Sequence, residues 1–440
     1  MSAASPIRCL RLRDNAMTIL IRRSRFPIVI GVIAALSAGC AVNFKPVPLD
    51  TLPYLERAET LEKNGVRVTV AVLTRDEARR AFGKQLDKKS IQPVWIQIEN
   101  NTDRDYWFMR HGLDPDYFSA FEAAYVIHGG NAANMEEIDD YFLGLRIDPF
   151  APPGASTSGF VFTNLKQGTK EVRVRLLGDK ELLEFEFYIT VPGLRADWQR
   201  VDFQSLYAKE DIIDFDDPIA FREALEAFPC CTTKKNGSGS GDPMNLVVIA
   251  SKDELQAFIK AGWDETEIIT TGSSWRTFKS FVSGGEYKNS PISALYVYGR
   301  AQDISLQKAR ETIHERNHLR LWLSPMRWRS QPVWMGAISR DIGVFWTTRT
   351  WNLTTHAIDP AVDEARNYLT EDLATAESLA EFSLIDGVGE VTQENPKQNL
   401  LGSPWWTNGR RVILLLSTEP VPLDEIEMFG LEQIMGSDPN

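Results

Sequence analysis

The stretch HERNH, residues 314–318, has the residue types and the spacing of a zinc-peptidase motif. On a helix, two histidines four residues apart and the glutamate after the first one face a single zinc ion, with the glutamate as general base. Glu364 is a carboxylate that could be recruited as a third ligand. His314, His318 and Glu364 therefore define a minor alternative, a zinc peptidase.

The residues around this motif argue against a zinc-binding helix. The active-site helix of a zinc peptidase is buried, whereas KARETIHERNHLR offers only Ala309 and Ile313 to a core. Burying such a helix would leave several charges without partners. Leu321 also stands where the extended motif has a glycine. The sequence therefore predicts no bound metal and no other cofactor.

A helix followed by a strand explains the same letters better. We expect a helix from about Asp303 to Ile313 and a strand from Arg316 onward. Because successive side chains of a strand point to opposite faces, one face is basic and the other is apolar. The basic face carries Arg316, His318, Arg320 and Trp322, and the apolar face carries Leu319, Leu321 and Leu323. Two guanidinium groups beside an imidazole suit a phosphate or a carboxylate.

A second polar group follows in TTHAIDPAVDEAR. His356 is a potential proton carrier, and Asp359 before Pro360 is the expected cap of the next helix. Asp363 and Arg366 are three residues apart on that helix and are expected to pair. If the start of this helix packs against the strand, its side chains converge with His318 and the arginines. Such a group would bind an acidic or phosphorylated ligand, or perform general acid–base catalysis.

The two adjacent cysteines, Cys230 and Cys231, lie in the glycine-rich stretch PCCTTKKNGSGSGDP. In an oxidising compartment they pair either with each other or across molecules. We expect a disulfide between the two neighbours that fixes this turn. Redox catalysis would call for a motif with a spacer between the cysteines.

The amino terminus has the order of a secretory signal. Six arginines precede the apolar run FPIVIGVIAALSAGC, which is shorter than the roughly 20 residues that span a bilayer. The ending LSAGC resembles a bacterial lipobox, in which Cys40 is lipidated and becomes the first mature residue. Met17 is an alternative start, and a plain cleaved signal or an uncleaved anchor are alternatives to lipidation. Ala41 after the cysteine is similar to lipoproteins of the outer membrane.

The charge of the chain bears on its partners. Removing the six arginines and one aspartate of residues 1–39 takes the formal net charge from −12 to −17. An acidic body of this kind argues against nucleic acid and against electrostatic docking on anionic lipid. The expected membrane contact is therefore a lipid on Cys40.

The remaining chain is long enough for more than one core and is expected to be α+β with two domains. Alternating strands predict an immunoglobulin-like β-sandwich with a helical insertion, and later strands and helices predict a mixed α/β domain. The expected segments are a signal peptide (1–39), a tether (40–64), the sandwich (65–198) with its insertion (about 112–150), a connector (199–242), the mixed domain (243–420) and a tail (421–440).

The mixed domain contains several blocks in order that resemble a known family. The stretches NLVVIAS, LYVYGRAQDISLQKAR, NHLRLWLSP, PVWMGAISRDIGV and THAIDPAVDEARNYL resemble the LssY carboxy-terminal domain of bacterial envelope proteins. This family has no established activity, so the resemblance implies a domain and not a mechanism. Its occasional fusion to membrane phosphatase-like domains implies lipid or phosphate chemistry nearby.

Two classes of function remain. The first is a non-catalytic lipoprotein of the cell envelope that faces the periplasm and binds a ligand or a partner. The second is an envelope hydrolase for phosphoester or lipid-related substrates, which uses His318 and His356 with arginine support. The sequence contains no serine elbow, P-loop or dinucleotide fingerprint that would favour another enzyme class.

Overall fold

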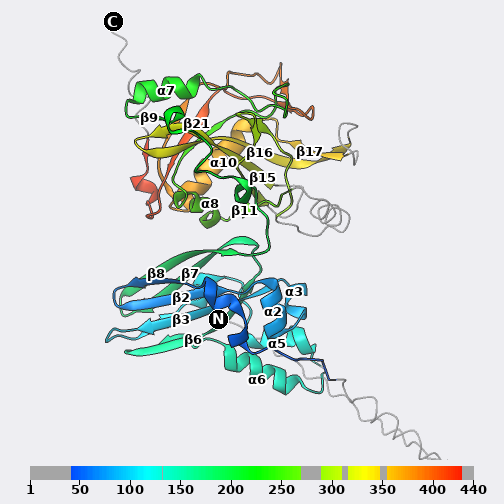
Figure 1. Ribbon diagram of the computed structural model, residues 1–440, viewed down its shortest axis with the longest axis vertical. Helices are drawn as coiled ribbons and strands as arrows, with labels where there is room; N and C mark the ends of the chain where they lie inside the picture. Colours follow the sequence, from blue (N-terminus) through cyan, green and yellow to red (C-terminus); the bar gives the residue numbers. More distant parts are fainter. Residues whose placement is uncertain (1–40, 131, 269–288, 310–315, 347–353, 429–440) are drawn as a thin grey trace, which may run out of the picture.

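The structure of the protein is a computed structural model in which helices and strands are both abundant (Figure 1). It describes residues 41–130, 132–268, 289–309, 316–346 and 354–428. The predicted α+β class is confirmed. No helix within these ranges combines the length and the apolar character needed to cross a membrane.

The first part of the chain forms two four-stranded sheets. One has the order β1-β2-β3-β6 and the other the order β5-β4-β7-β8, and all pairs are antiparallel. Apolar side chains from both sheets share one core. The strands are β1 (Glu59–Lys63), β2 (Val66–Val72), β3 (Ile91–Asn100), β4 (Tyr106–Phe108), β5 (Phe150–Ala151), β6 (Ala155–Asn164), β7 (Gly168–Gly178) and β8 (Glu181–Val191).

Short helices cover one end of these sheets (Figure 1). They are α2 (Arg75–Phe82), α3 (Gln85–Lys88), α4 (Arg110–Leu113), α5 (Ala120–His128) and α6 (Met135–Leu145). Both α2 and α5 begin with a capping box, formed by Thr74 with Glu77 and by Ser119 with Glu122. Their apolar side chains form a second core with β3 and β6. Helices α5 and α6 lie in the segment 112–150, for which the sequence predicts an insertion.

The expected tether over residues 40–64 is wrong for its described residues. Leu52 and Tyr54 are buried in the second core, and residues 59–63 form the edge strand β1. The backbone of Val42 exchanges hydrogen bonds with the amide of Asn134, at 2.9 and 3.0 Å. This segment packs because its apolar residues find partners on the helices, which a proline-bearing composition does not reveal.

The second part of the chain is built on a ten-stranded mixed sheet. Its order is β11-β14-β15-β16-β10-β21-β18-β22, with β17 paired to β16 and β9 to β15. Three pairs are parallel: β10 with β21, β9 with β15, and β18 with β22. The strands are β9 (Ile213–Phe215), β10 (Leu246–Ile249), β11 (Asp264–Glu265), β14 (Ile304–Ala309), β15 (Arg316–Trp328), β16 (Gln331–Trp346), β17 (Thr354–Ile358), β18 (Leu379–Ile385), β21 (Arg411–Leu416) and β22 (Glu427–Met428).

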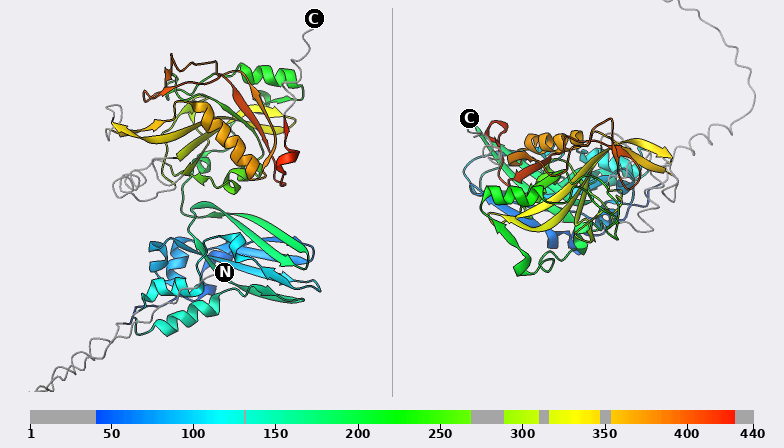
Figure 2. Two further views of the ribbon diagram at one scale, coloured as in Figure 1. Left: turned by 180° about the vertical axis from the view of Figure 1, so that it is seen from behind. Right: turned by 90° about the horizontal axis from the view of Figure 1, so that it is seen from above.

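Helices cover both faces of this sheet, and each face has its own core. Helix α10 (Val362–Thr375) lies across one face, as Figure 2 shows, together with α8 (Ala257–Lys260). Helix α7 (Pro218–Glu226) packs on the other face. We call them the α10 face and the α7 face. Two short hairpins lie outside the sheet: β12 (Tyr296–Val297) with β13 (Arg300–Ala301), and β19 (Lys397–Gln398) with β20 (Pro404–Trp405).

The predicted connector and tail are not separate from this sheet but contribute strands to it. The connector 199–242 supplies β9 and α7, whose Phe221 and Leu225 are fully buried. The tail 421–440 supplies the edge strand β22 within its described part. Both contribute apolar or backbone partners that the sheet needs, so neither is an independent linker.

The expected helix from Asp303 to Ile313 is wrong. Residues 304–309 form β14, which pairs antiparallel with β15 in a register that places Gln307 opposite His318. Strand pairing on both sides, to β11 and to β15, outweighs the helical preference of SLQKAR. Residues 310–315 lie outside the described residues.

The two parts of the chain meet at the carboxylate of Glu265. It accepts hydrogen bonds from Trp198 Nε1 at 2.5 Å and from the Thr169 backbone at 2.6 Å. Beside it, Lys166 Nζ lies 2.6 Å from the carboxylate of Asp264. Charged and aromatic donors of the first part are therefore fixed to β11 of the mixed sheet.

Candidate functional site

Strand β15 places the predicted basic residues together on the α7 face. Leu319 and Leu321 point to the α10 face and pack against α10, whereas Trp322 lies in the α7-face core. Because side chains alternate along a strand, Arg316, His318 and Arg320 share the side of Trp322. The predicted division of this strand into two faces is confirmed. All three basic side chains are buried, with exposed fractions of 4, 5 and 7 %.

His318 is paired with a buried carboxylate that the sequence interpretation missed. Its Nε2 atom lies 2.6 Å from Oδ2 of Asp341, on the neighbouring strand β16. Burial lowers the pKa of His318 to about 4, although the charge of Asp341 opposes this shift. At neutral pH the imidazole is therefore uncharged, and its proton sits on Nε2 to meet the carboxylate.

This tautomer leaves the other ring nitrogen as a lone-pair acceptor. His318 Nδ1 is buried and has no hydrogen-bond partner among the residues that the structure describes. The residue directly across the ladder is Ser339, which is also buried. A buried acceptor without a partner is costly and marks a position where a ligand atom or a proton would be stabilised.

Within the described part of the chain, the two arginines beside His318 form long ion pairs. Arg316 donates to Gln307 at 2.8 Å, and its Nε lies 3.6 Å from Asp341. Arg320 donates to the Ser293 backbone at 3.3 Å, and its Nη1 lies 3.7 Å from Asp242. Burial lowers the pKa of both guanidinium groups, against the attraction of these carboxylates.

The ion pairs of both guanidinium groups with the described carboxylates are long. A close guanidinium–carboxylate hydrogen bond is about 2.8 Å long and commonly bidentate, so distances of 3.6 and 3.7 Å are weak substitutes. Nε of Arg316 is buried, and no described residue forms a hydrogen bond with it. We call Arg316, His318, Arg320 and Asp341 the basic cluster.

The zinc-helix interpretation of HERNH is wrong. Residues 316–318 begin β15, so His318 cannot share a helix face with His314, which lies outside the described residues together with Glu315. Glu364 is on α10, across the sheet from His318. No group of three or more potential metal ligands occurs among the residues that the structure describes.

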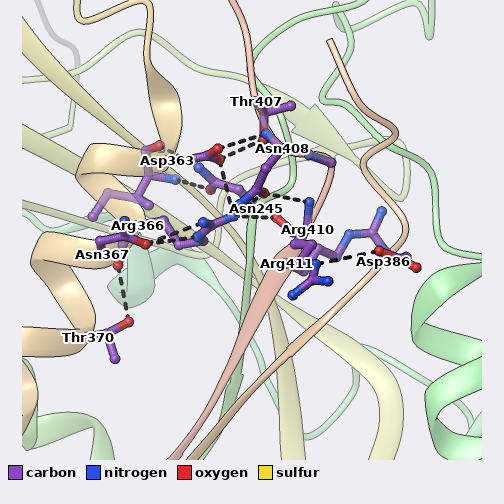
Figure 3. A network of polar contacts seen from close by, with 12 residues as sticks. Asn245, Asp363, Arg366, Asn367, Thr370, Asp386, Thr407, Asn408, Arg410 and Arg411 are labelled. Carbon is purple, nitrogen blue, oxygen red and sulfur yellow. Dashed lines mark hydrogen bonds and ion pairs between the residues drawn. The ribbon is translucent and has the colours of Figure 1, made fainter. Parts of the chain in front are cut away.

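Asp363 and Arg366 form a separate network at the start of α10 (Figure 3). The expected pair between them is present at 3.1 Å. Arg366 also donates to the Arg410 carbonyl at 2.8 Å, and Asp363 accepts from Thr407 and from the Asn408 backbone at 2.6 and 2.7 Å. Burial lowers the pKa of Arg366. This network locks α10 to the loop before β21.

The expected convergence of this helix with His318 does not occur. The apolar side chains of α10 pack on the α10 face, whereas the basic cluster lies on the α7 face. Asp359 is not the residue that caps α10, because the helix starts two residues later than predicted. Its carboxylate instead accepts from the Ala361 backbone at 3.0 Å. His356 lies on β17 opposite Val344 of β16.

The adjacent cysteines form the expected disulfide between Cys230 and Cys231. It follows the carboxyl end of α7, and Cys231 is buried against Val362 and Trp405. Cys40, the predicted lipidation site, lies outside the described residues.

The two carboxylates beside the basic side chains, Asp341 and Asp242, were not among the residues that the sequence singled out. Asp341 ends the stretch QPVWMGAISRD, and only the pairing of β15 with β16 brings it to His318. Asp242 belongs to the loop after Cys231 and reaches Arg320 through tertiary packing. Asp341 could have been found as a carboxylate two residues after a buried position of its strand, on the same face. No such pattern marks Asp242.

The fold and the cluster define a mixed-sheet α+β domain with charged side chains buried against one face of the sheet. Residues 223–410 match the family model described as "LssY C-terminus", so this part of the chain is a LssY C-terminal domain. The match starts within α7, includes the basic cluster and ends directly before β21. No curated protein matches the chain.

Proposed function

We propose that this protein is a cell-envelope lipoprotein whose LssY C-terminal domain binds a small anionic ligand at the basic cluster. The ligand class is a phosphate- or carboxylate-bearing molecule. The anionic group would lie between Arg316 and Arg320, and a neighbouring hydroxyl or protonated oxygen would donate to Nδ1 of His318.

One observation carries this proposal: among the described residues, the carboxylates nearest to the two buried guanidinium groups are 3.6 and 3.7 Å away, and none of these residues is hydrogen-bonded to Nδ1 of the imidazole between them. Removing a charged group from water costs several kcal/mol unless close pairing offsets it. Distances of 3.6 and 3.7 Å do not provide such pairing. An anion with several oxygens would accept close hydrogen bonds from both arginines, and a hydroxyl of the same ligand would donate to the lone pair of His318 Nδ1.

The placement of this site in the cell rests on the amino terminus. The proposal includes a cleaved signal, lipidation of Cys40 and a periplasm-facing position at the outer membrane. It also includes two domains, of which the first is an immunoglobulin-like sandwich. Separate apolar cores in the two parts of the chain, and one core between the two four-stranded sheets, support that layout. Replacement of Cys40 by alanine is expected to abolish labelling of the protein by radioactive palmitate in cells.

The ligand proposal is tested by calorimetric titration of residues 41–440 with inorganic phosphate, glycerol phosphate and a dicarboxylate. Arg320→Lys retains a positive charge but loses the planar donor fork, which is expected to weaken binding by about tenfold. Arg327→Lys is the matched control, because Arg327 is exposed on the same strand. Absence of heat with every anion, or equal losses in both variants, would refute the proposed site.

A second candidate function is hydrolysis of a phosphoester or a related lipid substrate. It is favoured by the pair of His318 and Asp341, in which the carboxylate orients an uncharged imidazole with a free lone pair. Such an imidazole accepts a proton from a nucleophile, and Ser339 is the hydroxyl residue across the ladder. Turnover of generic phosphoesters or esters that Ser339→Ala abolishes would establish this function. Inertness of the wild-type protein on these substrates would exclude it as stated.

A further inference from the structure

The disulfide lies on a narrow loop whose two arms are paired. The Met244 backbone donates to the Cys230 carbonyl at 2.7 Å, and the Thr232 backbone donates to the Asp242 carbonyl at 3.0 Å. Cys231 is bridged to Pro243 between these bonds. The backbone of the cysteines is therefore directly joined to the segment that carries Asp242.

The two arms are in close contact at the position before Asp242. A Cβ atom added to Gly241 would lie 2.4 Å from Oγ1 of Thr232 and 3.1 Å from its carbonyl oxygen. No side chain fits there, so a shift of the Thr232 backbone displaces Gly241 as well. Any change at the cysteine arm is thus transmitted across the loop.

The base of the loop is held in place by Arg411. Its guanidinium donates to the Phe228 and Pro229 carbonyls at 2.6 and 2.9 Å on one arm, and to the Met244 carbonyl at 2.8 Å on the other. Arg411 is completely buried. With the base fixed, a rearrangement at the disulfide is confined to the residues beyond it, which include Asp242.

Asp242 is the point where this loop meets the basic cluster. Its carboxylate is buried, lies 3.7 Å from Arg320 Nη1 and accepts from Asn399 at 3.0 Å. An anion bound to Arg320 would lie within a few ångströms of this negative charge. Two like charges this close together repel each other, and the repulsion is weakly screened in a buried site. Asp242 therefore opposes the binding of an anion and competes with it for Arg320.

We propose that the Cys230–Cys231 disulfide is a redox control of the anion site, acting through Asp242. In the oxidised protein the loop holds the Asp242 carboxylate beside Arg320, and anion affinity is low. In the reduced protein the loop relaxes, Asp242 withdraws, and affinity rises. This inference rests on the proposed function, because it concerns regulation of the same site.

The chemical step is disulfide exchange with a dithiol. A thiolate of the dithiol attacks Sγ of Cys230, which is half-buried, whereas Cys231 is buried. The bond between the cysteines breaks, and Cys231 leaves as a thiolate that takes up a proton. The second thiol of the reductant then displaces Cys230 and closes its own disulfide, so that two electrons pass from the dithiol to the protein.

The test compares phosphate affinity before and after reduction of residues 41–440 with dithiothreitol. Reduction is expected to tighten phosphate binding about tenfold, which corresponds to about 1.4 kcal/mol. Asp242→Asn should bind phosphate about as tightly in both redox states, because the competing charge is gone. Asp386→Asn is the matched control, since it removes one negative charge from an exposed aspartate whose ion-pair partner is Arg410, and its redox response should equal that of the wild type.

The outcomes separate this inference from the proposed function. Equal phosphate affinity in both redox states of the wild type overturns the redox control and leaves the anion site standing. No phosphate binding in either state overturns both. A redox response that persists in Asp242→Asn also overturns the inference, because a merely structural disulfide would act independently of that charge. If reduced wild type loses its fold, the variant with both cysteines changed to serine is titrated in its place.

Discussion

The burial of His318 predicts how the free energy of unfolding depends on pH. Burial lowers the pKa of His318 to about 4 in the folded protein, whereas an unfolded histidine has a pKa of about 6.5. Between these values the unfolded chain binds more protons than the folded chain. The free energy of unfolding therefore has its full value above about pH 6.5 and decreases as the pH falls toward 4.

The size of this effect follows from the two pKa values. Between pH 7 and pH 4.5, one imidazole with this shift should lower the free energy of unfolding by about 2 kcal/mol. His318→Gln removes the titrating ring, but its amide still donates to Asp341. In this variant, the part of the pH dependence that comes from His318 should disappear.

The assay is hydrogen exchange of peptides from β15 and β16 at increasing urea, which reports the free energy of opening of this sheet. His111→Gln is the control, because His111 is exposed on α4 and far from the basic cluster in the chain. Wild type and control should lose the same stability between pH 7 and pH 4.5, and His318→Gln about 2 kcal/mol less. Identical pH dependence in all three proteins would refute a buried, uncharged His318.

Three further perturbations have defined outcomes. Arg411→Lys leaves several buried carbonyls without donors and should lower the free energy of unfolding by about 3 kcal/mol. Urea denaturation measures this loss. The same substitution at the exposed neighbouring residue, Arg410→Lys, should have a much smaller effect. Glu265→Ala removes the acceptor of Trp198 and Thr169. The loss of these hydrogen bonds should cost about 2 kcal/mol and accelerate limited proteolysis between the two parts of the chain by roughly thirtyfold. Unchanged cleavage would contradict the role of this contact. Asp363→Ala should cost about 3 kcal/mol of stability by removing the carboxylate that pairs with Arg366, yet leave phosphate affinity unchanged, because α10 covers the face of the sheet away from the basic cluster.

The sequence predicts the parts of the site that depend on one strand or one turn. Period-two alternation in RNHLRLW identifies the basic face of β15, because burial of the leucines fixes which side each residue takes. The adjacent cysteines and the pair of Asp363 with Arg366 are likewise set by local spacing. These features need no knowledge of the tertiary structure.

Features that depend on pairing between distant segments are not predicted. The stretch ISLQKA has helical spacing, yet it pairs with two strands and becomes β14. Helix α10 ends at Thr375, since Glu377 takes a left-handed backbone with φ of 54° and β18 begins at Leu379. The carboxylate partners of the basic cluster come from a neighbouring strand and from a loop, and only the folded sheet assembles them.

The most direct test of the anion site is a crystal of residues 41–440 soaked in tungstate, a heavy analogue of phosphate. An anomalous density peak is expected on the α7 face, with oxygens about 3 Å from the guanidinium groups of Arg316 and Arg320. Soaking crystals of reduced protein should strengthen that peak. If the protein binds phosphate in solution but the tungstate density lies elsewhere, with none at these arginines, the proposed anion site is contradicted.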